Sequence, residues 1–212
     1  IDKGFRDPRA FANLGSIYKQ MDQIEKAIYM FKKSIVLFPN STDAYLNLGM
    51  ILKNIGDTKE AEILTRKAIY INPKLAEGYV NLGMILRDIG EIEEAEICNL
   101  NAIKLNSNLV EAYVNLGLIK QEIGDLKEAK KWVSLAIKIK PSFAIAHNNL
   151  GIIMQSLGKL NDAEKSFRKA IKLNPESSSF NNNLATILIN LGKQNKAEYY
   201  ARKAIKINPN FS

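Results

Sequence analysis

Residues 42–75 read TDAYLNLGMILKNIGDTKEAEILTRKAIYINPKL, and residues 76–109 read AEGYVNLGMILRDIGEIEEAEICNLNAIKLNSNL. The two stretches follow one another without a gap and agree at 17 of 34 positions. A fixed period of this length indicates small structural units that stack on their neighbours, because one unit buries too little surface to be stable alone.

The same step of 34 residues extends in both directions from this pair. Glycine recurs, with Ala185 in the sixth copy, at Gly15, Gly49, Gly83, Gly117 and Gly151. Alanine recurs in every copy, at Ala27, Ala61, Ala95, Ala129, Ala163 and Ala197. Proline recurs, with Ser107 in the third copy, at Pro39, Pro73, Pro141, Pro175 and Pro209. The step predicts a lead-in over residues 1–7 and one continuous domain of six repeats, over residues 8–41, 42–75, 76–109, 110–143, 144–177 and 178–211.

Each repeat has the pattern of two helices joined by a short turn. In the second repeat the apolar residues follow the spacing of one helical face, at Tyr45, Leu48, Ile51, Leu52 and Ile55. Gly56 is expected to end this helix, and Asp57 to cap the next one. The second helix is expected over Lys59–Ile71, because Pro73 stops it. The same turn is expected at Gly90-Glu91, Gly124-Asp125, Gly158-Lys159 and Gly192-Lys193. The sequence therefore predicts an all-α protein of stacked antiparallel helical hairpins.

Composition excludes several functional classes. Hydrophobic residues make up 46% and charged residues 25% of the chain, which is typical of a soluble globular protein. No apolar run approaches the roughly 20 residues that span a bilayer, and no signal peptide opens the chain, so a cytoplasmic location is expected. One cysteine, Cys98, and one histidine, His147, cannot build a disulfide framework or a zinc site. The repeat phase places these two residues two repeats apart, so we expect no catalytic pair, no metal, no cofactor and no enzyme activity in these residues.

The pattern resembles the tetratricopeptide repeat, whose marks are an aromatic residue, Leu-Gly, a second aromatic residue, Ala, a large residue, Ala and Pro over 34 residues. The first repeat supplies them as Phe11, Leu14-Gly15, Tyr18, Ala27, Phe31, Ser34 and Pro39. Departures occur at Ser107, Ala185, Asn181, Thr65 and Asn99. The resemblance covers residues 8 to 211 and implies a right-handed α-solenoid, a superhelix whose concave face is lined by the first helix of each repeat. It also implies a partner that binds there as an extended peptide or as a helix.

Three sets of residues are then expected to line a peptide-binding groove. An asparagine stands two residues before the glycine position in every repeat, at Asn13, Asn47, Asn81, Asn115, Asn149 and Asn183. This row resembles the asparagine ladder in the repeats of O-linked N-acetylglucosamine transferase, and a carboxamide can pair with both the N–H and the C=O of a peptide. The alternative is a hydrogen bond to a neighbouring helix. The second set is apolar, namely Leu46, Met50, Val80, Met84, Val114 and Leu118, with packing between repeats as the alternative. The third set is a basic edge of Lys19, Lys53 and Arg87, with simple solvation as the alternative.

These expectations favour a scaffold for protein–protein interaction. The carboxylate clamp of chaperone-tail adaptors is not expected, because Ala12 and Ser16 occupy its positions. One alternative is the substrate-recognition region of a larger enzyme, such as a glycosyltransferase or a sulfotransferase. Another is nucleic-acid binding, because residues 107–212 hold 16 basic and 8 acidic side chains and so supply the whole net charge of +8. Its candidates are Lys130, Lys131, Lys138, Lys140, Lys165, Arg168, Lys169, Lys172, Arg202, Lys203 and Lys206.

The end of the sequence suggests a fragment of a longer protein, since Asn210–Ser212 resemble the start of a seventh repeat. The final helix is expected to present an uncovered face made of Ala197, Tyr200, Ala201, Ala204 and Ile205. Solenoids normally cover such a face with a polar capping helix. We therefore expect this end to associate with a second copy of the chain or with further sequence.

Overall fold

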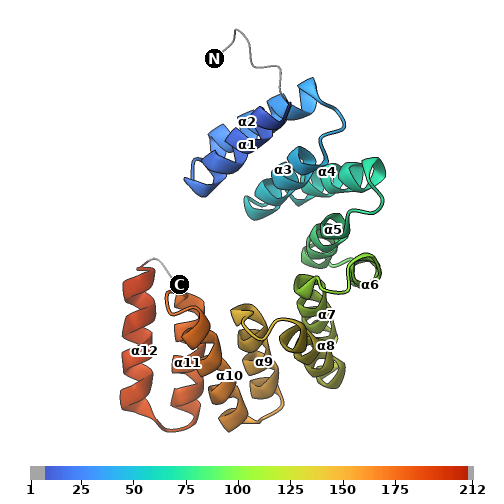
Figure 1. Ribbon diagram of the computed structural model, residues 1–212. Coiled ribbons are helices and arrows are strands. Elements are labelled where there is room, and N and C mark those ends of the chain that lie inside the picture. Colours follow the sequence, from blue (N-terminus) through green and yellow to red (C-terminus); the bar gives the residue numbers. More distant parts are fainter. Residues whose placement is uncertain (1–7, 210–212) are drawn as a thin grey trace. The chain divides into compact units, whose positions relative to one another are not determined.

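The computed structural model describes residues 8–209, so the lead-in over residues 1–7 and the residues 210–212 lie outside the described part. Twelve α-helices and no strand occur in residues 8–209, and they alternate between the first and second helix of each hairpin (Figure 1). The first helices, called A helices, are α1 (Pro8–Gln20), α3 (Thr42–Asn54), α5 (Ala76–Asp88), α7 (Val110–Glu122), α9 (Ala144–Ser156) and α11 (Ser178–Asn190). The second helices, called B helices, are α2 (Ile24–Leu37), α4 (Thr58–Ile71), α6 (Ile92–Leu105), α8 (Leu126–Ile139), α10 (Leu160–Leu173) and α12 (Gln194–Ile207). The predicted α-solenoid of helical hairpins is confirmed.

The contacts divide the chain into two compact units, with unit 1 ending at Leu109 and unit 2 beginning at Val110. Within unit 1, the A helix α3 approaches both α1 and α5 to Cα–Cα distances of 8 Å or less. Within unit 2, α9 approaches α7 and α11 in the same way. Among the described residues of either unit, successive B helices make no such approach to each other. Each unit therefore has an inner side formed by A helices and an outer side formed by B helices.

The turn between the two helices of a hairpin depends on a left-handed residue. Gly56, Gly90, Gly124, Gly158 and Gly192 occupy this position with φ values between 69° and 94°, which are strained for residues that have a Cβ. The first repeat has Asp22 at the same position, with a φ of 56°.

The expected caps are only partly confirmed. Asp57 and Asp125 each accept a hydrogen bond from the backbone N–H three residues later, at 3.3 Å and 3.0 Å. Glu91, Lys159 and Lys193 make no such side-chain cap. Short carboxylates reach the N–H groups of the first turn, whereas the longer glutamate and lysine side chains are poor at this position.

The recurrent small residues bring the two helices of a hairpin close together. The alanines at the position of Ala27 are at most 3% exposed in all six repeats. A Cβ added to Gly49 would lie 2.8 Å from the Thr65 hydroxyl and 3.2 Å from the Ala61 carbonyl oxygen. A Cβ added to Gly15 would lie 2.9 Å from two ring carbons of Phe31. Glycine is therefore required on the A helix because the facing side chain of the B helix leaves no room for a Cβ.

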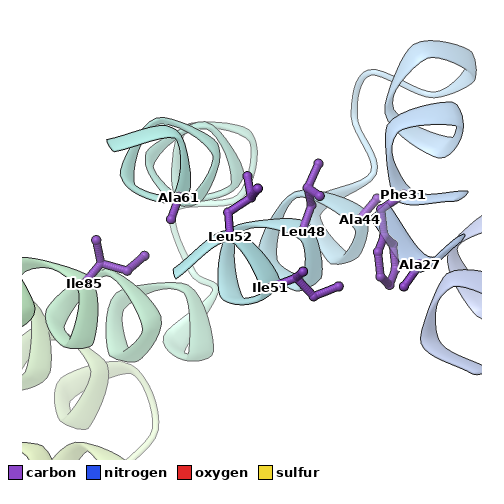
Figure 2. Close-up of a cluster of buried hydrophobic side chains, with 8 residues drawn as sticks. All are labelled: Ala27, Phe31, Ala44, Leu48, Ile51, Leu52, Ala61 and Ile85. Carbon is purple, nitrogen blue, oxygen red and sulfur yellow. The ribbon is translucent and has the colours of Figure 1, made fainter. Parts of the chain in front are cut away.

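Within each unit the core continues from one repeat to the next. Figure 2 shows one buried cluster of unit 1, which joins α2, α3, α4 and α5 through Ala27, Phe31, Ala44, Leu48, Ile51, Leu52, Ala61 and Ile85. A matching cluster in unit 2 joins α9, α10, α11 and α12 through Met154, Ala163, Phe167, Leu184, Ile187, Leu188 and Ala197. Within each unit, neighbouring repeats thus bury apolar side chains against one another, as a solenoid requires.

The uncovered face expected on the last helix is partly wrong. Ala197 and Ala204 are buried, and Ala197 belongs to the cluster that includes Leu184 and Leu188 of α11. Tyr200 is half-buried, and its hydroxyl accepts a 3.2 Å hydrogen bond from Arg168 Nη1 of the preceding repeat. Of the predicted residues, only Ile205 is strongly exposed, and the unpredicted Tyr199, whose ring lies against that of Tyr200, is exposed as well.

Candidate binding surface on the A helices

In unit 1 the predicted asparagines lie on three successive A helices. Asn13 on α1 is exposed, whereas Asn47 on α3 and Asn81 on α5 are half-buried. The Asn47 Nδ2 atom donates to the Asp43 carbonyl oxygen at 3.0 Å, one turn earlier on the same helix. The Asn47 Oδ1 atom accepts from Lys19 Nζ at 3.2 Å. Two of the predicted sets therefore meet, because Lys19 of the basic edge contacts the asparagine of the next repeat.

The other two residues of the basic edge share one carboxylate. Lys53 Nζ lies 2.6 Å from Asp88 Oδ2, and Arg87 Nη2 lies 3.1 Å from Asp88 Oδ1. Burial acts to raise the pKa of Asp88, but the hydrogen bonds and charges of Lys53 and Arg87 outweigh it and hold that pKa below its ordinary value. The edge is therefore partly neutralised by Asp88, which sequence reasoning missed although it directly follows Arg87.

The apolar set separates into two kinds of residue. Leu46, Val80 and Val114 are buried, whereas Met50, Met84 and Leu118 are half-buried. Leu46 forms a core cluster with Tyr45 and Ala68, and Ile35 of the preceding repeat packs against that cluster. The first kind therefore serves mainly for packing, and only the second kind keeps surface for a ligand.

In unit 2 the predicted asparagines are less accessible. Asn115 and Asn149 are buried and Asn183 is half-buried. Asn183 Nδ2 donates to Asn148 Oδ1 at 2.9 Å, across the boundary between the fifth and sixth repeats. Asn148 Nδ2 in turn lies 3.5 Å from Asn149 Oδ1. Carboxamides of neighbouring repeats are thus engaged with each other, which favours the structural alternative for this part of the row.

The polar departures from the repeat pattern have local explanations. His147 and Asn181 replace the first aromatic residue, and both hydrogen-bond to the carbonyl oxygen of a proline six residues earlier. The distances are 2.9 Å from His147 Nε2 to Pro141 and 3.1 Å from Asn181 Nδ2 to Pro175. These side chains fasten the A helix to the turn before it.

The chemically reactive side chains are engaged or buried. Burial raises the pKa of the Cys98 thiol to about 11, so the thiolate needed for nucleophilic attack is disfavoured. The His147 ring is held by Pro141, as described above. The described residues contain no group of three or more His, Cys, Asp or Glu side chains that could hold a metal ion. Each described helix has 13 or 14 residues, and none is long and apolar enough to cross a membrane.

Comparison with known structures shows the same fold in other proteins. The chain superposes with a TM-score of 0.87 on a chain of the APC/C hetero-tetramer Cut9-Hcn1, at 18% identity, covering 99% of this chain and 42% of that one. It thus spans less than half the length of that relative. MamA gives a TM-score of 0.61 at 28% identity, covering 76% of this chain and 95% of that one. YrrB, a TPR protein with an unusual peptide-binding site, gives a TM-score of 0.54 at 19% identity, covering 85% and 93%.

No curated protein sequence matches the chain. Family models described as tetratricopeptide repeats match most of its length. The matched ranges are residues 8–41, 30–63, 76–109, 110–143, 144–177 and 166–199. Together with the helical hairpins and their small-residue contacts, these matches settle the family. The chain belongs to the tetratricopeptide repeat family.

Proposed function

We propose that the chain is a protein-interaction scaffold that binds an extended segment of a partner along the A helices of unit 1. The A-helix surface of unit 1 is defined by Asn13, Lys19, Asn47, Met50, Lys53, Asn81, Met84 and Arg87. The observation that carries the proposal is that amide and cationic side chains recur on three successive A helices, with a thioether on two of them, and keep part of their surface exposed. The peptide-binding site of YrrB, a distant structural relative, is consistent with this use of the fold.

The amides alone would not give high affinity. Ordering an extended segment costs about 1–2 kcal/mol per residue, whereas one net hydrogen bond returns about 0.5–1.5 kcal/mol. Asn47 has already used one donor and one acceptor within the protein. The remaining amide atoms therefore supply a grip on the backbone that does not depend on the partner's sequence.

Affinity and selectivity would come from the other side chains of the surface. Met50 and Met84 are half-buried, and methionine adapts its shape to different apolar partners. Lys19, Lys53 and Arg87 are cationic, and Asp88 neutralises part of the charge of Lys53 and Arg87. A segment with an apolar residue next to an acidic residue fits this combination.

The equivalent residues of unit 2 offer less to a partner. Asn115, Asn149, Asn183, Val114 and Leu118 remain proposed as binding residues. However, Val114 and two of the three asparagines are buried, and Asn183 donates to Asn148. We therefore propose that a segment bound to unit 2 would make weaker contacts than a segment bound to unit 1.

A displayed library of twelve-residue segments, selected on the purified chain, tests the proposal. The double variant Asn81→Ala with Met84→Glu is expected to weaken the selected segments by at least about tenfold, a size typical of losing a central contact. The control is Ile97→Glu, which changes an exposed residue on the outer helix α6 and is expected to leave binding unchanged. Equal binding by the double variant and the wild-type chain would contradict the proposal.

The nucleic-acid alternative receives less support from the geometry. Its candidate cations lie on the B helices α8, α10 and α12 or just after α8. Four of them pair with an acidic residue one turn earlier on the same helix, as Lys131–Glu128, Lys165–Asp162, Arg168–Glu164 and Arg202–Glu198. An affinity for nucleic acid that falls steeply with salt would favour this alternative, and an affinity independent of salt would reject it. The recognition region of a larger enzyme remains compatible with the same surface, because such a region would also bind a protein segment.

A further inference from the structure

Isoleucine occupies the same position of the A helix in every repeat. The residues are Ile17, Ile51, Ile85, Ile119, Ile153 and Ile187. The last five are at most 2% exposed, whereas Ile17 is 50% exposed. Ile51 lies in the cluster that contains Ala27 and Phe31 of the preceding B helix (Figure 2). Ile187 likewise lies with Ala163 and Phe167 of the preceding repeat. No described helix precedes α1, so Ile17 presents one half of an inter-repeat junction to solvent.

The B helix carries the other half of the same junction. An isoleucine again occurs in every repeat, at Ile35, Ile69, Ile103, Ile137, Ile171 and Ile205. The first five are half-buried, whereas Ile205 is 60% exposed. Ile171 packs against the cluster that contains Ile187, and Ile35 packs against the cluster that contains Ile51. Ile205 and Ile17 are therefore the exposed members of the two isoleucine positions that belong to the described junctions, one on the last described helix and one on the first.

A polar contact shows the same relationship. The hydrogen bond from Asn183 to Asn148 joins corresponding faces of the A helices of the sixth and fifth repeats. In the first repeat, Asn13 on α1 occupies the position of Asn183. In the sixth repeat, Asn182 on α11 occupies the position of Asn148, and both Asn13 and Asn182 are exposed. If a further A helix packed on the sixth repeat, an asparagine at the position of Asn13 could repeat this bond to Asn182.

We propose that two copies of the chain associate end to end, with α1 of one copy packed against α11 and α12 of another. This contact brings Ile17 and Ile205 into one junction and places Asn13 beside Asn182. A second copy fits because α1 is itself an A helix with the Leu14-Gly15 pair and the isoleucine that the internal junctions accept. The two contacting faces differ, so the interface is heterologous.

The end-to-end contact should be weaker than the internal one. The junction between the fifth and sixth repeats also contains the ion pair of Lys193 with Glu164, at 2.6 Å. The corresponding residues at the ends are Gln23 and Glu198, which cannot form an ion pair with each other. The association is therefore reversible and depends on protein concentration.

Sedimentation velocity of the 212-residue chain over a range of concentrations tests this proposal. The wild-type average mass is expected to rise above 23.8 kDa as the concentration increases. Ile205→Glu and Ile17→Glu are each expected to weaken association by at least about tenfold, because each places a charge in the apolar junction. Ile63→Glu is the matched control, since Ile63 is also 60% exposed but lies on the outer side of α4, and it should associate as the wild-type chain does. Circular dichroism should show the same helix content in all variants, since the substituted residues are exposed.

Mixing the two end variants gives a sharper test. Ile17→Glu keeps an intact α12 end, and Ile205→Glu keeps an intact α1 end. An equal mixture can form only one interface, so its mass is expected to stop at two copies. A wild-type chain that stays at 23.8 kDa at all concentrations overturns the proposal. Normal association by either single variant also overturns the proposal. If only Ile17→Glu associates normally, the contact lies between the α12 ends of two copies.

Discussion

Lys193 Nζ donates a 2.6 Å hydrogen bond to Glu164 Oε2, and so joins the start of α12 to α10 of the preceding repeat. Arg168, one turn later on α10, donates to the other oxygen of the same carboxylate at 2.9 Å. The Glu164 side chain is only 13% exposed, which distinguishes this bridge from most ion pairs at the surface.

The first prediction concerns the strength of this bridge. Glu164→Gln is expected to lower the free energy of unfolding by about 1 kcal/mol, a modest value because Lys193 is 40% exposed and solvent screens the pair. Chemical denaturation of Glu164→Gln, Lys193→Met and the double variant would give the coupling between the two residues. The exposed pair of Asp162 with Lys165 provides the control, and Asp162→Asn is expected to change stability by less than about 0.5 kcal/mol. Equal effects at Glu164 and Asp162 would contradict this prediction.

The same carboxylate predicts a dependence on pH. The hydrogen bond from Lys193 holds the pKa of Glu164 below its ordinary value, against the opposing effect of burial, and Arg168 contributes in the same direction. A carboxylate with a lowered folded-state pKa stabilises the fold above its unfolded-state pKa of about 4.3, and the effect is lost as the pH falls through the folded-state value. The stability difference between the wild-type chain and Glu164→Gln should therefore be full at neutral pH and shrink below about pH 4. Thermal unfolding at a series of pH values measures it, and a difference that stays constant on acidification would refute it.

A third prediction concerns the close contact between the helices of the fifth hairpin. A Cβ on Gly151 would lie 2.5 Å from Cε1 and 2.6 Å from Cδ1 of the fully buried Phe167 ring. Gly151→Ala is therefore expected to lower the free energy of unfolding by about 1–3 kcal/mol, despite the better helix propensity of alanine.

Phe167→Leu should reduce this penalty, because the smaller side chain leaves room for the added methyl group. The sixth repeat supports the reasoning, since alanine stands at both corresponding positions, as Ala185 and Ala201. Denaturant titration of the two single variants and the double variant checks the coupling. A penalty for Gly151→Ala that is the same in both backgrounds would show that the Phe167 ring is not its cause.

A fourth prediction concerns the first turn. Asp22 has a φ of 56° at the position where the other five repeats have glycine. A left-handed conformation costs about 1–2 kcal/mol for ordinary residues and less for aspartate. Asp22→Gly is therefore expected to raise the free energy of unfolding by about 0.5 kcal/mol, because the entropy cost of glycine offsets part of the relieved strain. Asp22→Ala is the control and should give no gain, and a fall in stability for Asp22→Gly would contradict the prediction.

Most of the fold could be predicted from the sequence because the repeat makes one local pattern visible six times. The start and end of α4, at Thr58 and Ile71, lie within one residue of the prediction. The turn glycines follow from their own backbone chemistry and need no tertiary information.

The binding surface was harder to predict because it depends on the contacts between repeats. Repeat phase identifies the helix of Leu46 and Val80, but it does not show how far the next repeat covers them, and both are buried. The carboxylate of Asp88 was missed because its partner Lys53 belongs to the preceding repeat. The pairing of Asn183 with Asn148 likewise joins two repeats. These features require the separation and rotation of neighbouring hairpins, which a 34-residue period does not specify.

The buried thiol on α6 offers an experimental use that follows from its environment. Cys98 is the single cysteine of the chain, and burial raises its pKa to about 11. A thiol reagent can modify it rapidly only after α6 separates from its neighbours, because the thiolate forms when the group is solvated. The alkylation rate of the unmodified protein therefore reports the local opening of the third repeat. Comparing that rate with the rate of global unfolding would show whether the third repeat opens separately from the rest of the chain.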